Sequence, residues 1–380
     1  MTSTATAAAT NGHSHANGSA SLARNAGTSS IEDAIAAMRA GKFVVVMDNE
    51  DRENEGDLIM AAEFATEESV AFMLRHTTGI ICVPALAPRL TELQLPLMVE
   101  NNTEVHKCKF TVTVDLREGN STGVSAADRA RTIRALADPR VQAAAFNRPG
   151  HIFPLLAMDG GVLVRAGHTE AATDLSRLAG SAPVGYICEM NDEHGRMMRR
   201  PQLEAFAIKY ELPLITISDL IRYRVRTETL VTRKSAKDAG VRSRVVTPHG
   251  QFAAFEYASA ASAAQSYEVL VFGSVAGRAD VPVYFVEEGF AQSVDAQWAQ
   301  QHIAAHGAGI LIYVNDSKKL LEISGELMAR QSIFGMGMQI ARDQQVASVA
   351  LLSTQEKVAF DPQGFGVAVS AVQRLAIPSL

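Results

Sequence analysis

Two short stretches of the chain concentrate side chains that can do chemistry. Residues 51–57 read DRENEGD and place four acids and an arginine shortly after the apolar run FVVVMD. Residues 165–169 read RAGHT, which brings a guanidinium, an imidazole and a hydroxyl together around a glycine. An arginine can bind an oxyanion such as phosphate through two parallel hydrogen bonds, and a glycine lets backbone N–H groups approach it. Taken alone, each stretch is also explained without chemistry, as a solvated turn and as a structural histidine.

The elements that must position these stretches alternate between strands and helices. Ser30 and Asp33 form a capping-box pattern, and apolar residues then recur at helical spacing until Gly41. FVVVMD follows as a buried strand, Thr66 can cap the helix EESVAFMLRHT, and GIICVPA is typical of a second buried strand. Further along come the helix TDLSRLAG, the strand PVGYICEM, the helix QLEAFAIKYE opened by Pro201, the strand LPLITI and the helix DLIRYR capped by Ser218. This alternation predicts an α/β domain that ends near residue 224.

The rest of the chain divides at a polar stretch. Residues 226–244 are polar and basic without clear periodicity, which is typical of a linker between a domain over residues 30–225 and a second domain. Strand-like runs joined by Gly, Asp and Asn turns follow, with helices expected around 294–305 and 337–345, so residues 245–380 are predicted to form a smaller α+β domain. Residues 1–29 are rich in Ala, Thr, Ser, Asn and Gly, and we expect a disordered tail there rather than a signal peptide.

Length and composition limit the classes of protein to consider. At 380 residues the chain is long enough for two cores, and 47% apolar with 20% charged residues is an ordinary globular composition. The net charge of −6 gives no electrostatic basis for binding nucleic acid or an anionic membrane, and no apolar run is long enough to span one. Cys82, Cys108 and Cys188 are odd in number and too far apart for a zinc-finger spacing, which favours reduced thiols and a cytoplasmic protein.

A series of motifs in fixed order resembles one enzyme family. The motifs are DNEDRENEGDLIMAAE, RHTTGIIC, LPLMVENNT, STGVSAADRARTI, RPGHIFPL, GGVLVRAGHTEAATDLSRLAG and CEMNDEHGRMMR. Over roughly Ser30 to Arg224 the chain thereby resembles 3,4-dihydroxy-2-butanone 4-phosphate synthase of the riboflavin pathway. The resemblance implies a lyase that converts D-ribulose 5-phosphate to L-3,4-dihydroxy-2-butanone 4-phosphate and formate with magnesium or manganese. It also implies a homodimer with its active site at the subunit interface.

The same resemblance implies ligands for the metal ion and for the substrate. Glu53 and His168 match the metal ligands, and so small a set suits magnesium because this ion keeps several of its waters. Cys82 matches a residue that lines the site and is expected to be a contact rather than a nucleophile. For Thr122 a role as a helix cap is the alternative to a substrate contact. The implied substrate contacts are Arg52, Glu53, Asp57, Cys82, Thr122, Arg165, Ala166, Gly167, His168 and Thr169.

Acid and base roles follow from the resemblance together with the clustering of carboxylates. His151 and Glu189 fall on the essential catalytic positions of the family. Glu55 and Asp48 lie close enough in sequence to take part in proton transfers. Clustered carboxylates raise one another's pKa, so one of them can accept a proton near neutral pH.

The second domain departs from a familiar pattern. TPHGQFAAFEY, FGMGMQIARDQQVASVALLS and GFGVAVSAVQRLAIP resemble the framework of GTP cyclohydrolase II, which binds a catalytic zinc through three closely spaced cysteines. No cysteine follows Cys188, and VNDSKKLLEISGELM replaces the segment that handles the nucleotide in that family. Because a catalytic zinc needs about three good protein ligands, we expect no zinc and a structural or regulatory domain. The alternative is a bifunctional enzyme with residual or altered cyclohydrolase activity, for which His302 and His306 are the substitute zinc ligands to consider.

Overall fold

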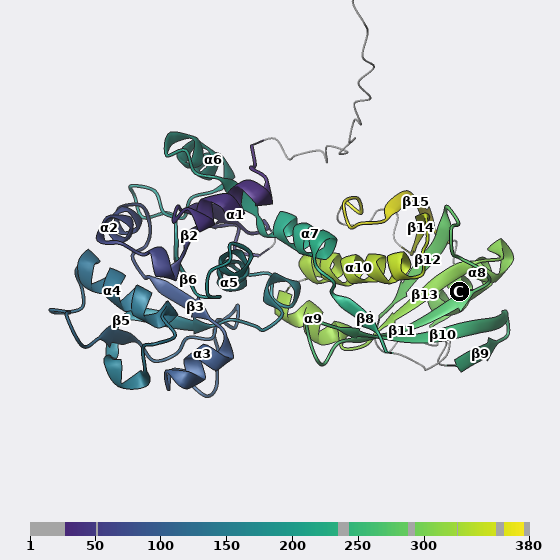
Figure 1. Cartoon of the computed structure of the whole chain (residues 1–380). Helices are drawn as coiled ribbons and strands as arrows, with labels where there is room; N and C mark the ends of the chain where they lie inside the picture. The colour runs from purple at the N-terminus through teal and green to yellow at the C-terminus, as the bar shows by residue number, and fades with distance from the viewer. Residues whose placement is uncertain are drawn as a thin grey trace, which may run out of the picture.

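The first domain is built around one mixed sheet. The computed structural model describes residues 27–50, 52–234, 243–287, 293–324, 326–354 and 361–375, which form two sheets with helices packed against them (Figure 1). The elements of the first domain are α1 (Ile31–Arg39), β1 (Val44–Met47), β2 (Gly56–Ala61), η1 (Ala62–Phe64), α2 (Glu67–His76), β3 (Cys82–Ala85), α3 (Ala87–Glu92), β4 (Val114–Leu116), α4 (Ala126–Ala137), η2 (Ala143–Ala145), β5 (Phe146–Leu156), η3 (Gly161–Leu163), α5 (His168–Leu178), β6 (Gly185–Glu189), α6 (Arg200–Lys209), β7 (Leu214–Thr216) and α7 (Ile217–Thr227).

The strand order of this sheet brings distant charged stretches together. The order is β4-β5-β3-β6-β2-β1-β7. β1 and β2 form an antiparallel hairpin in which Met47 lies opposite Gly56, so the charged stretch belongs to the loop of the hairpin and the start of β2. β2 also pairs antiparallel with β6, where Asp57 lies opposite Glu189. One end of the sheet therefore collects acids from two separate sequence motifs.

Helices cover both faces of this sheet. Successive side chains of a strand point to opposite faces. Accordingly Val44 and Val46 belong to one apolar core, whereas Val45 and Met47 belong to another. Helices α1 and α5 pack against strands on the first side, with α5 in contact with β1, β2, β3 and β6. A strand buried on both faces needs a continuous apolar run, which is why VVVM reads without alternation.

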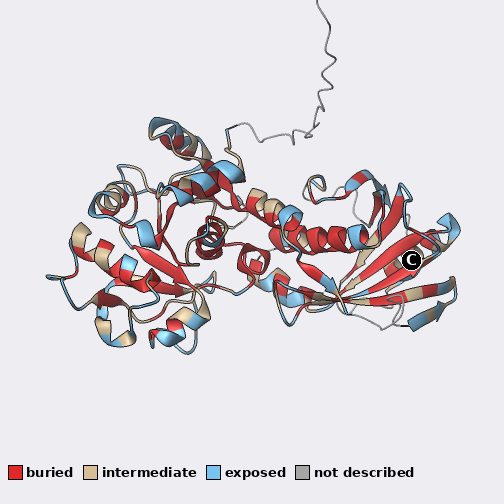
Figure 2. Cartoon of the chain, viewed as in Figure 1, coloured by how far each residue is buried: buried red, intermediate tan, exposed pale blue. Residues whose placement is uncertain are grey.

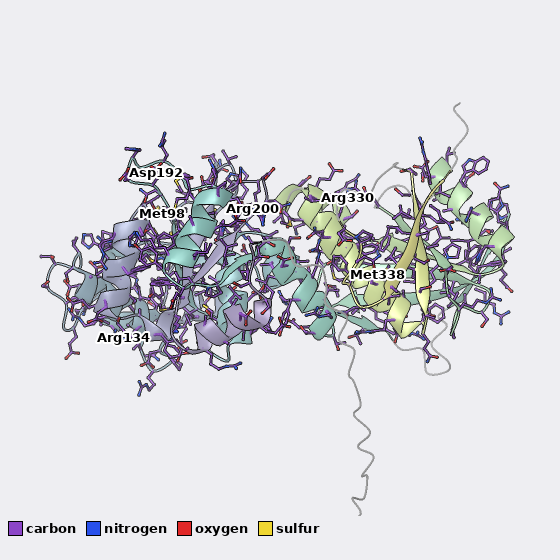
Figure 3. All side chains as sticks on the ribbon, turned by 90° about the horizontal axis from the view of Figure 1, so that it is seen from above. Met98, Arg134, Asp192, Arg200, Arg330 and Met338 are labelled. Carbon is purple, nitrogen blue, oxygen red and sulfur yellow. The ribbon has the colours of Figure 1, made fainter. Side chains whose placement is uncertain are left out.

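The second domain has its own sheet. Its elements are β8 (Val231–Arg233), β9 (Ser243–Thr247), β10 (Gly250–Ser259), β11 (Ser266–Phe272), β12 (Val281–Val286), α8 (Val294–His306), β13 (Gly309–Val314), α9 (Ser317–Ser324), α10 (Glu326–Asp343), β14 (Ser348–Ser353) and β15 (Ala368–Arg374). The strand order is β15-β14-β12-β13-β11-β10-β8, and β9 pairs with the far end of β10. Seen from above, α10 carries Arg330 and Met338 along the side of the sheet that faces the first domain (Figure 3).

The two domains share an apolar core. Val225 of α7 and Met336 of α10 belong to the same cluster of buried side chains, and the two helices pack directly on one another. Figure 2 shows buried residues along both helices where the domains meet. The amide of Gln339 adds polar contacts, because its Nε2 donates to the carbonyl oxygens of Val225 at 2.5 Å and Glu228 at 2.7 Å. The second domain is thus packed against the first rather than tethered to it.

Several sequence predictions are confirmed at helix ends. Ser30 and Asp33 form a capping box on α1, and Thr66 caps α2 through the N–H of Ser69. Pro201 lies in the first turn of α6, where its missing N–H has no intrahelical partner to lose. The expected helix around 294–305 is α8. No described helix has the length and apolar character needed to cross a membrane.

Other predictions were wrong in position. Thr216, not Ser218, caps α7, because its Oγ1 accepts from the N–H of Asp219 while the hydroxyl of Ser218 faces Gln331. The helix expected at TDLSRLAG begins earlier, at His168. The helix expected around 337–345 is the end of α10, which starts at Glu326 and has buried residues on most sides, so its periodicity is weak.

The boundary between the domains also differs from the expected one. β8 lies inside the stretch 226–244 that was expected to be a linker, and it pairs with β10 of the second sheet. Of that stretch, residues 235–242 lie outside the described residues, as does the expected tail up to residue 26.

Candidate active site

Asp48 shapes the charged loop between β1 and β2. Its carboxylate is buried and accepts hydrogen bonds from the backbone N–H groups of Glu53 at 3.0 Å and Glu55 at 2.8 Å. The guanidinium of Arg52 donates a third bond to it at 3.0 Å. With both oxygens occupied in this way, Asp48 orients the loop and aims Glu53 inward. Asp51 lies outside the described residues.

His168 meets this loop from the first turn of α5. The imidazole is buried, and its Nε2–H donates to the carbonyl oxygen of Val46 at 3.1 Å. This bond leaves Nδ1 facing Glu53 Oε2 at 3.4 Å and Asp57 Oδ1 at 3.7 Å. A histidine whose far nitrogen is fixed by a carbonyl is oriented as metal-binding histidines are. A cation at Nδ1 would replace the proton there.

Burial and neighbouring charges shift the pKa values of these groups in different directions. Burial raises the pKa of Glu53, but His168 and Arg52 outweigh this effect and lower it to about 2. For Asp57, burial raises the pKa to about 8, against the opposing charge of His168 and with help from Glu189. Burial lowers the pKa of His168, but Asp57 and Glu53 outweigh it and raise that pKa to about 9. Burial, followed by the charge of Glu53, also raises the pKa of Glu55.

Asp57 has an unused acceptor. Its Oδ1 atom is buried and has no hydrogen-bond partner among the described residues. An unsatisfied carboxylate oxygen is costly to bury unless a cation or a donor satisfies it. Asp48, Glu53 and His168 offer ligand atoms that all lie within 4.8 Å of one another beside it. The donor set, two carboxylates and an imidazole with a third carboxylate adjacent, fits a hard divalent cation.

The register of the sheet places His151 and Glu189 at the same end of the site. Phe153 of β5 and Ile187 of β6 both pair with Cys82 of β3. His151 lies two residues before Phe153 on the strand parallel to β3, and Glu189 lies two residues after Ile187 on the antiparallel one. Both residues therefore lie near the same end of the sheet, and their side chains project from the same face. The carboxylate of Glu189 is held by the hydroxyl of Thr78 at 2.8 Å.

Asp115 orients His151, and the sequence did not single it out. One oxygen of Asp115 accepts from the backbone N–H of His151 at 2.9 Å, and the other lies 2.7 Å from Nδ1 of the ring. The imidazole is 48% exposed, so its Nε2 atom is available to a substrate. An acid inside the strand-like run TVTVDL was the available signal. Two more supporting residues were not predicted from the sequence: Thr78, which bonds Glu189, and Glu170, which bonds Arg165.

Thr122 lies beside this pair. It is exposed, and its neighbour Gly123 packs directly against the Asp115 carboxylate. Ser125 rather than Thr122 caps α4, accepting from the N–H of Asp128. The alternative role of Thr122 as that helix cap is thereby excluded, which leaves its hydroxyl available.

The RAGHT segment is held by buried charge. Arg165 donates to Glu170 at 2.7 Å through Nη1, and through Nη2 to the carbonyl oxygen of His106 at 3.1 Å and the thiol of Cys108 at 3.0 Å. Gly167 is required here, because a side chain on it would lie 2.6 Å from Arg165 Nη1 and 3.1 Å from Arg52 Nη2. Two guanidinium groups therefore flank the backbone that leads into α5, where the N–H groups of the first turn are free of intrahelical partners.

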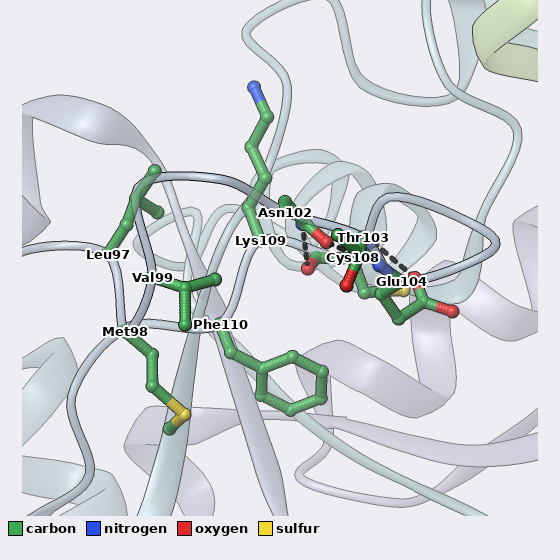
Figure 4. Close-up of a pocket in the computed structure, with 9 residues that line it drawn as sticks. All are labelled: Leu97, Met98, Val99, Asn102, Thr103, Glu104, Cys108, Lys109 and Phe110. Atoms are coloured by element: carbon green, nitrogen blue, oxygen red, sulfur yellow. Dashed lines mark hydrogen bonds between the residues drawn. The ribbon is translucent and has the colours of Figure 1, made fainter.

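Cys82 and a nearby pocket complete the surroundings. Burial raises the pKa of Cys82 well above its ordinary value, which keeps the thiol protonated and agrees with a contact rather than a nucleophile. Cys108 and Glu104 line a pocket of about 160 Å³ formed by the segment from Leu97 to Phe110 (Figure 4). Because Arg165 bonds to His106 and Cys108, this segment lies over the RAGHT backbone.

Comparison with known proteins decides the family. The sequence profile of 3,4-dihydroxy-2-butanone 4-phosphate synthase matches residues 32–223. The chain belongs to this family. It is therefore an enzyme of riboflavin biosynthesis, a lyase that converts D-ribulose 5-phosphate to L-3,4-dihydroxy-2-butanone 4-phosphate and formate. The expected activity is confirmed.

Relatives and solved structures extend the match beyond the first domain. The chain is 41% identical over 380 residues to the riboflavin biosynthesis protein RibBA of Salinispora arenicola (strain CNS-205), covering 92% of this chain and 88% of that protein. The crystal structure of RibBX, a two-domain 3,4-dihydroxy-2-butanone 4-phosphate synthase from A. baumannii, matches with a TM-score of 0.79 and 35% identity over 92% of this chain and 100% of that one. The predicted architecture, an α/β synthase domain followed by an α+β domain, is confirmed.

One similar solved structure contains magnesium. A 3,4-dihydroxy-2-butanone 4-phosphate synthase in complex with two magnesium ions is 45% identical to this chain with a TM-score of 0.51, and covers 52% of this chain and 98% of its own.

Proposed function

We propose that Glu53 and His168 hold the catalytic magnesium ion of this synthase. The observation that carries the proposal is the grouping of Asp48, Glu53 and His168, whose ligand atoms lie within 4.8 Å of one another, beside the unsatisfied Oδ1 of Asp57. A divalent cation there would stabilise the negative charge that develops on the substrate oxygens when a proton is removed beside the carbonyl. Manganese prefers the same oxygen-rich ligands and is proposed as an alternative.

The sugar phosphate would lie between the metal ligands and the start of α5. His168 and Thr169 present backbone N–H groups there, and the helix N-terminus favours an anion. The N–H groups of Ala166 and Gly167 already donate to Ser324 and to the carbonyl oxygen of Arg165, so these two residues would contact the substrate through their small surfaces. Arg165 already gives donors to Glu170, His106 and Cys108, so its charge acts on the phosphate from behind the segment or through its remaining hydrogen atoms. Arg52 lies on the other side of Gly167.

Proton transfers are proposed for the acids and the histidine around this position. Asp57 and Glu55 have raised pKa values, which suits groups that exchange protons near neutral pH. Glu189, fixed by Thr78, and His151, fixed by Asp115, would act on the other end of the substrate. Asp48 is better suited to holding the loop, since both of its oxygens already accept backbone hydrogen bonds.

We propose that an exposed apolar surface around the site forms the interface of a homodimer. Val105, Val99 and Met98 are 84%, 54% and 47% exposed and lie on the segment that covers the RAGHT backbone. Ile80 and Val124 are also exposed. Ile80 lies two residues after Thr78, which bonds Glu189, and Val124 lies two residues after Thr122. An exposed apolar surface around a site is typical of an interface, and a second copy of the chain is the proposed occupant. Cytoplasmic location is likewise proposed, from the unpaired thiols.

The second domain is proposed to be structural or regulatory. Its buried polar side chains in the described ranges are all serines and glutamines, which are poor zinc ligands. His302 and His306 are exposed on α8, and His306 already bonds the carbonyl oxygen of Ala308. Residual or altered cyclohydrolase activity is the alternative, and it would need a metal-activated water or its equivalent.

A formate assay with ribulose 5-phosphate tests the assigned roles. The enzyme as purified and freed of metal should release formate when magnesium or manganese is added and should not when calcium is added, because calcium prefers a larger and more flexible ligand set. Activity that is equal with and without any divalent cation would contradict the metal assignment.

A further inference from the structure

One hydroxyl of the second domain reaches the substrate-binding segment of the first. Ser324 is the last residue of α9 and is 5% exposed. Its Oγ donates to the carbonyl oxygen of Val164 at 2.7 Å and accepts from the N–H of Ala166 at 3.3 Å. These two backbone groups lie immediately before and after Arg165, so a single side chain from the second domain fixes the peptide units on both sides of that arginine.

The rest of the segment is clamped by the first domain and by one more contact with the second. Asp174 of α5 accepts from the N–H of Val162 at 2.9 Å, and Arg224 of α7 donates to Asp174 and to the carbonyl oxygen of Gly160, both at 2.8 Å. Gly160 also packs against the backbone of Ala261 in the second domain, so closely that a side chain would overlap the Ala261 carbonyl oxygen. Residues 160–166 therefore have partners on both domains.

The hydrogen bonds from the two domains act at different places along the segment of residues 160–166. The first-domain clamp acts at its start, at residues 160–162, whereas Ser324 acts at Val164 and Ala166, next to Gly167 and His168. Gly167 has no side chain to fix its backbone, and its neighbours carry the two guanidinium groups and the metal-binding imidazole. A rotation of the peptide units around Arg165 would move the Arg165 guanidinium and the His168 imidazole relative to the phosphate and to Arg52, which belongs to the β1–β2 loop.

We infer that Ser324 is a positioning residue for the synthase reaction, through which the second domain holds the backbone of Val164–Ala166 in the conformation that binds the substrate phosphate. The inference rests on the proposed role of Arg165–Thr169 in phosphate binding. It gives the second domain a direct part in the first domain's chemistry without an active site of its own.

The test is the steady-state kinetics of Ser324→Ala in the full-length protein. Loss of the two hydrogen bonds should raise the KM for ribulose 5-phosphate about tenfold and change kcat by less than about threefold, since the bonds support binding of substrate and transition state alike. KM does not depend on the amount of active protein, so partial loss of folded enzyme would not imitate this result. Ser324→Thr keeps the hydroxyl and should restore KM to within about threefold of the wild type.

The matched control is Ser218→Ala. It removes another serine hydroxyl that bonds across the same domain interface, to Gln331 at 2.9 Å, but it does not touch residues 160–167. Its KM should be unchanged. Equal KM values for Ser324→Ala and the wild type, or equal rises in both alanine variants, would overturn the inference. Arg165→Lys, measured alongside, tests the premise separately: an unchanged KM in that variant would show that the phosphate is held elsewhere.

Discussion

The two domains bury different kinds of polar side chain. In the described ranges of the second domain the buried polar side chains carry no charge, and they are Ser259, Gln265, Gln300, Ser317, Ser324, Gln331, Ser332 and Gln339. In the first domain they include acids, arginines and a histidine, namely Asp48, Asp57, Asp115, Asp128, Arg165, His168, Glu170, Asp174 and Arg224. Burying a charge costs several kcal/mol per ion unless it is paired, so charge is retained where it has a task.

This difference in buried charge agrees with a catalytic role for the first domain and a supporting role for the second. Where the hairpin loop meets α5, burial raises the pKa of Asp57, whereas His168 and Arg52 outweigh burial and lower that of Glu53, and such a divergence is typical of a catalytic site. The second domain has an apolar core with hydrogen-bonded amides and hydroxyls, which is sufficient for a stable fold. The contribution to the reaction that we infer for it is made at the interface, through Ser324.

The sharpest test of the comparison removes one metal ligand. Glu53→Gln keeps the size of the side chain but loses its charge, and kcat should fall by at least about 10³-fold, as when a group that stabilises developing charge is lost. Binding of Mn²⁺, followed by electron paramagnetic resonance, should be lost in parallel.

Glu50→Gln is the matched control for this variant. Glu50 belongs to the same loop and is exposed, so both activity and Mn²⁺ binding should stay near those of the wild type. Normal Mn²⁺ binding by Glu53→Gln would remove Glu53 from the ligand set.

A second prediction concerns buried charge that holds the first domain together and does not contact the substrate. Arg224 pairs with Asp174 at 2.8 Å and with Glu228 at 3.0 Å. Arg224→Ala would leave Asp174 buried without its main partner, which typically costs about 3–5 kcal/mol. We expect that loss in the free energy of unfolding, measured with urea. Arg226→Ala breaks an exposed pair with Glu32 and a contact with the Tyr223 ring on the surface, and it should cost at most about 1 kcal/mol. Similar losses in both variants would contradict this account.

The third prediction concerns the orientation of His151. Asp115→Asn preserves the shape of the side chain but can hold the ring in the wrong tautomer, so kcat should fall on the order of 10²-fold while KM changes little. Asp138→Asn, at a partly exposed carboxylate paired with Arg140, should have no effect on kcat. If Asp115→Asn retained full kcat, the pair would be structural.

Local patterns in the sequence predicted much of the fold. Ser30 and Thr66 were identified as helix caps because capping depends on residues within one turn. The choice between Thr216 and Ser218 was missed because two hydroxyls stand two residues apart, and the end of β7 decides which one precedes the helix. Helix α10 was misplaced because a helix buried on most sides has little periodicity.

The site residues that belong to sequence motifs were predicted. Those whose role depends on tertiary contacts were missed. Glu53 and His168 belong to motifs, and the structure brings them together. Asp115 lies 36 residues before His151 and acquires its role from the pairing of β4 with β5. Ser324 lies 158 residues after Ala166, in a domain whose sequence gave no sign of a contact with the site. Such roles depend on which elements pack together, which a single sequence does not encode locally.

The smallest expected effect concerns zinc and the second domain. Opening the purine ring of GTP by hydrolysis would need a water activated by a metal in an open site with about three protein ligands. His302 and His306 are the closest approach to such a set on α8, and both are exposed without a third ligand from the described residues. We therefore expect no GTP consumption with or without added zinc, and unchanged formate release from ribulose 5-phosphate in the double variant His302→Ala, His306→Ala. One tightly bound zinc per chain together with GTP-dependent formate release would overturn the comparison, because the second domain would then hold a catalytic centre built without buried charge.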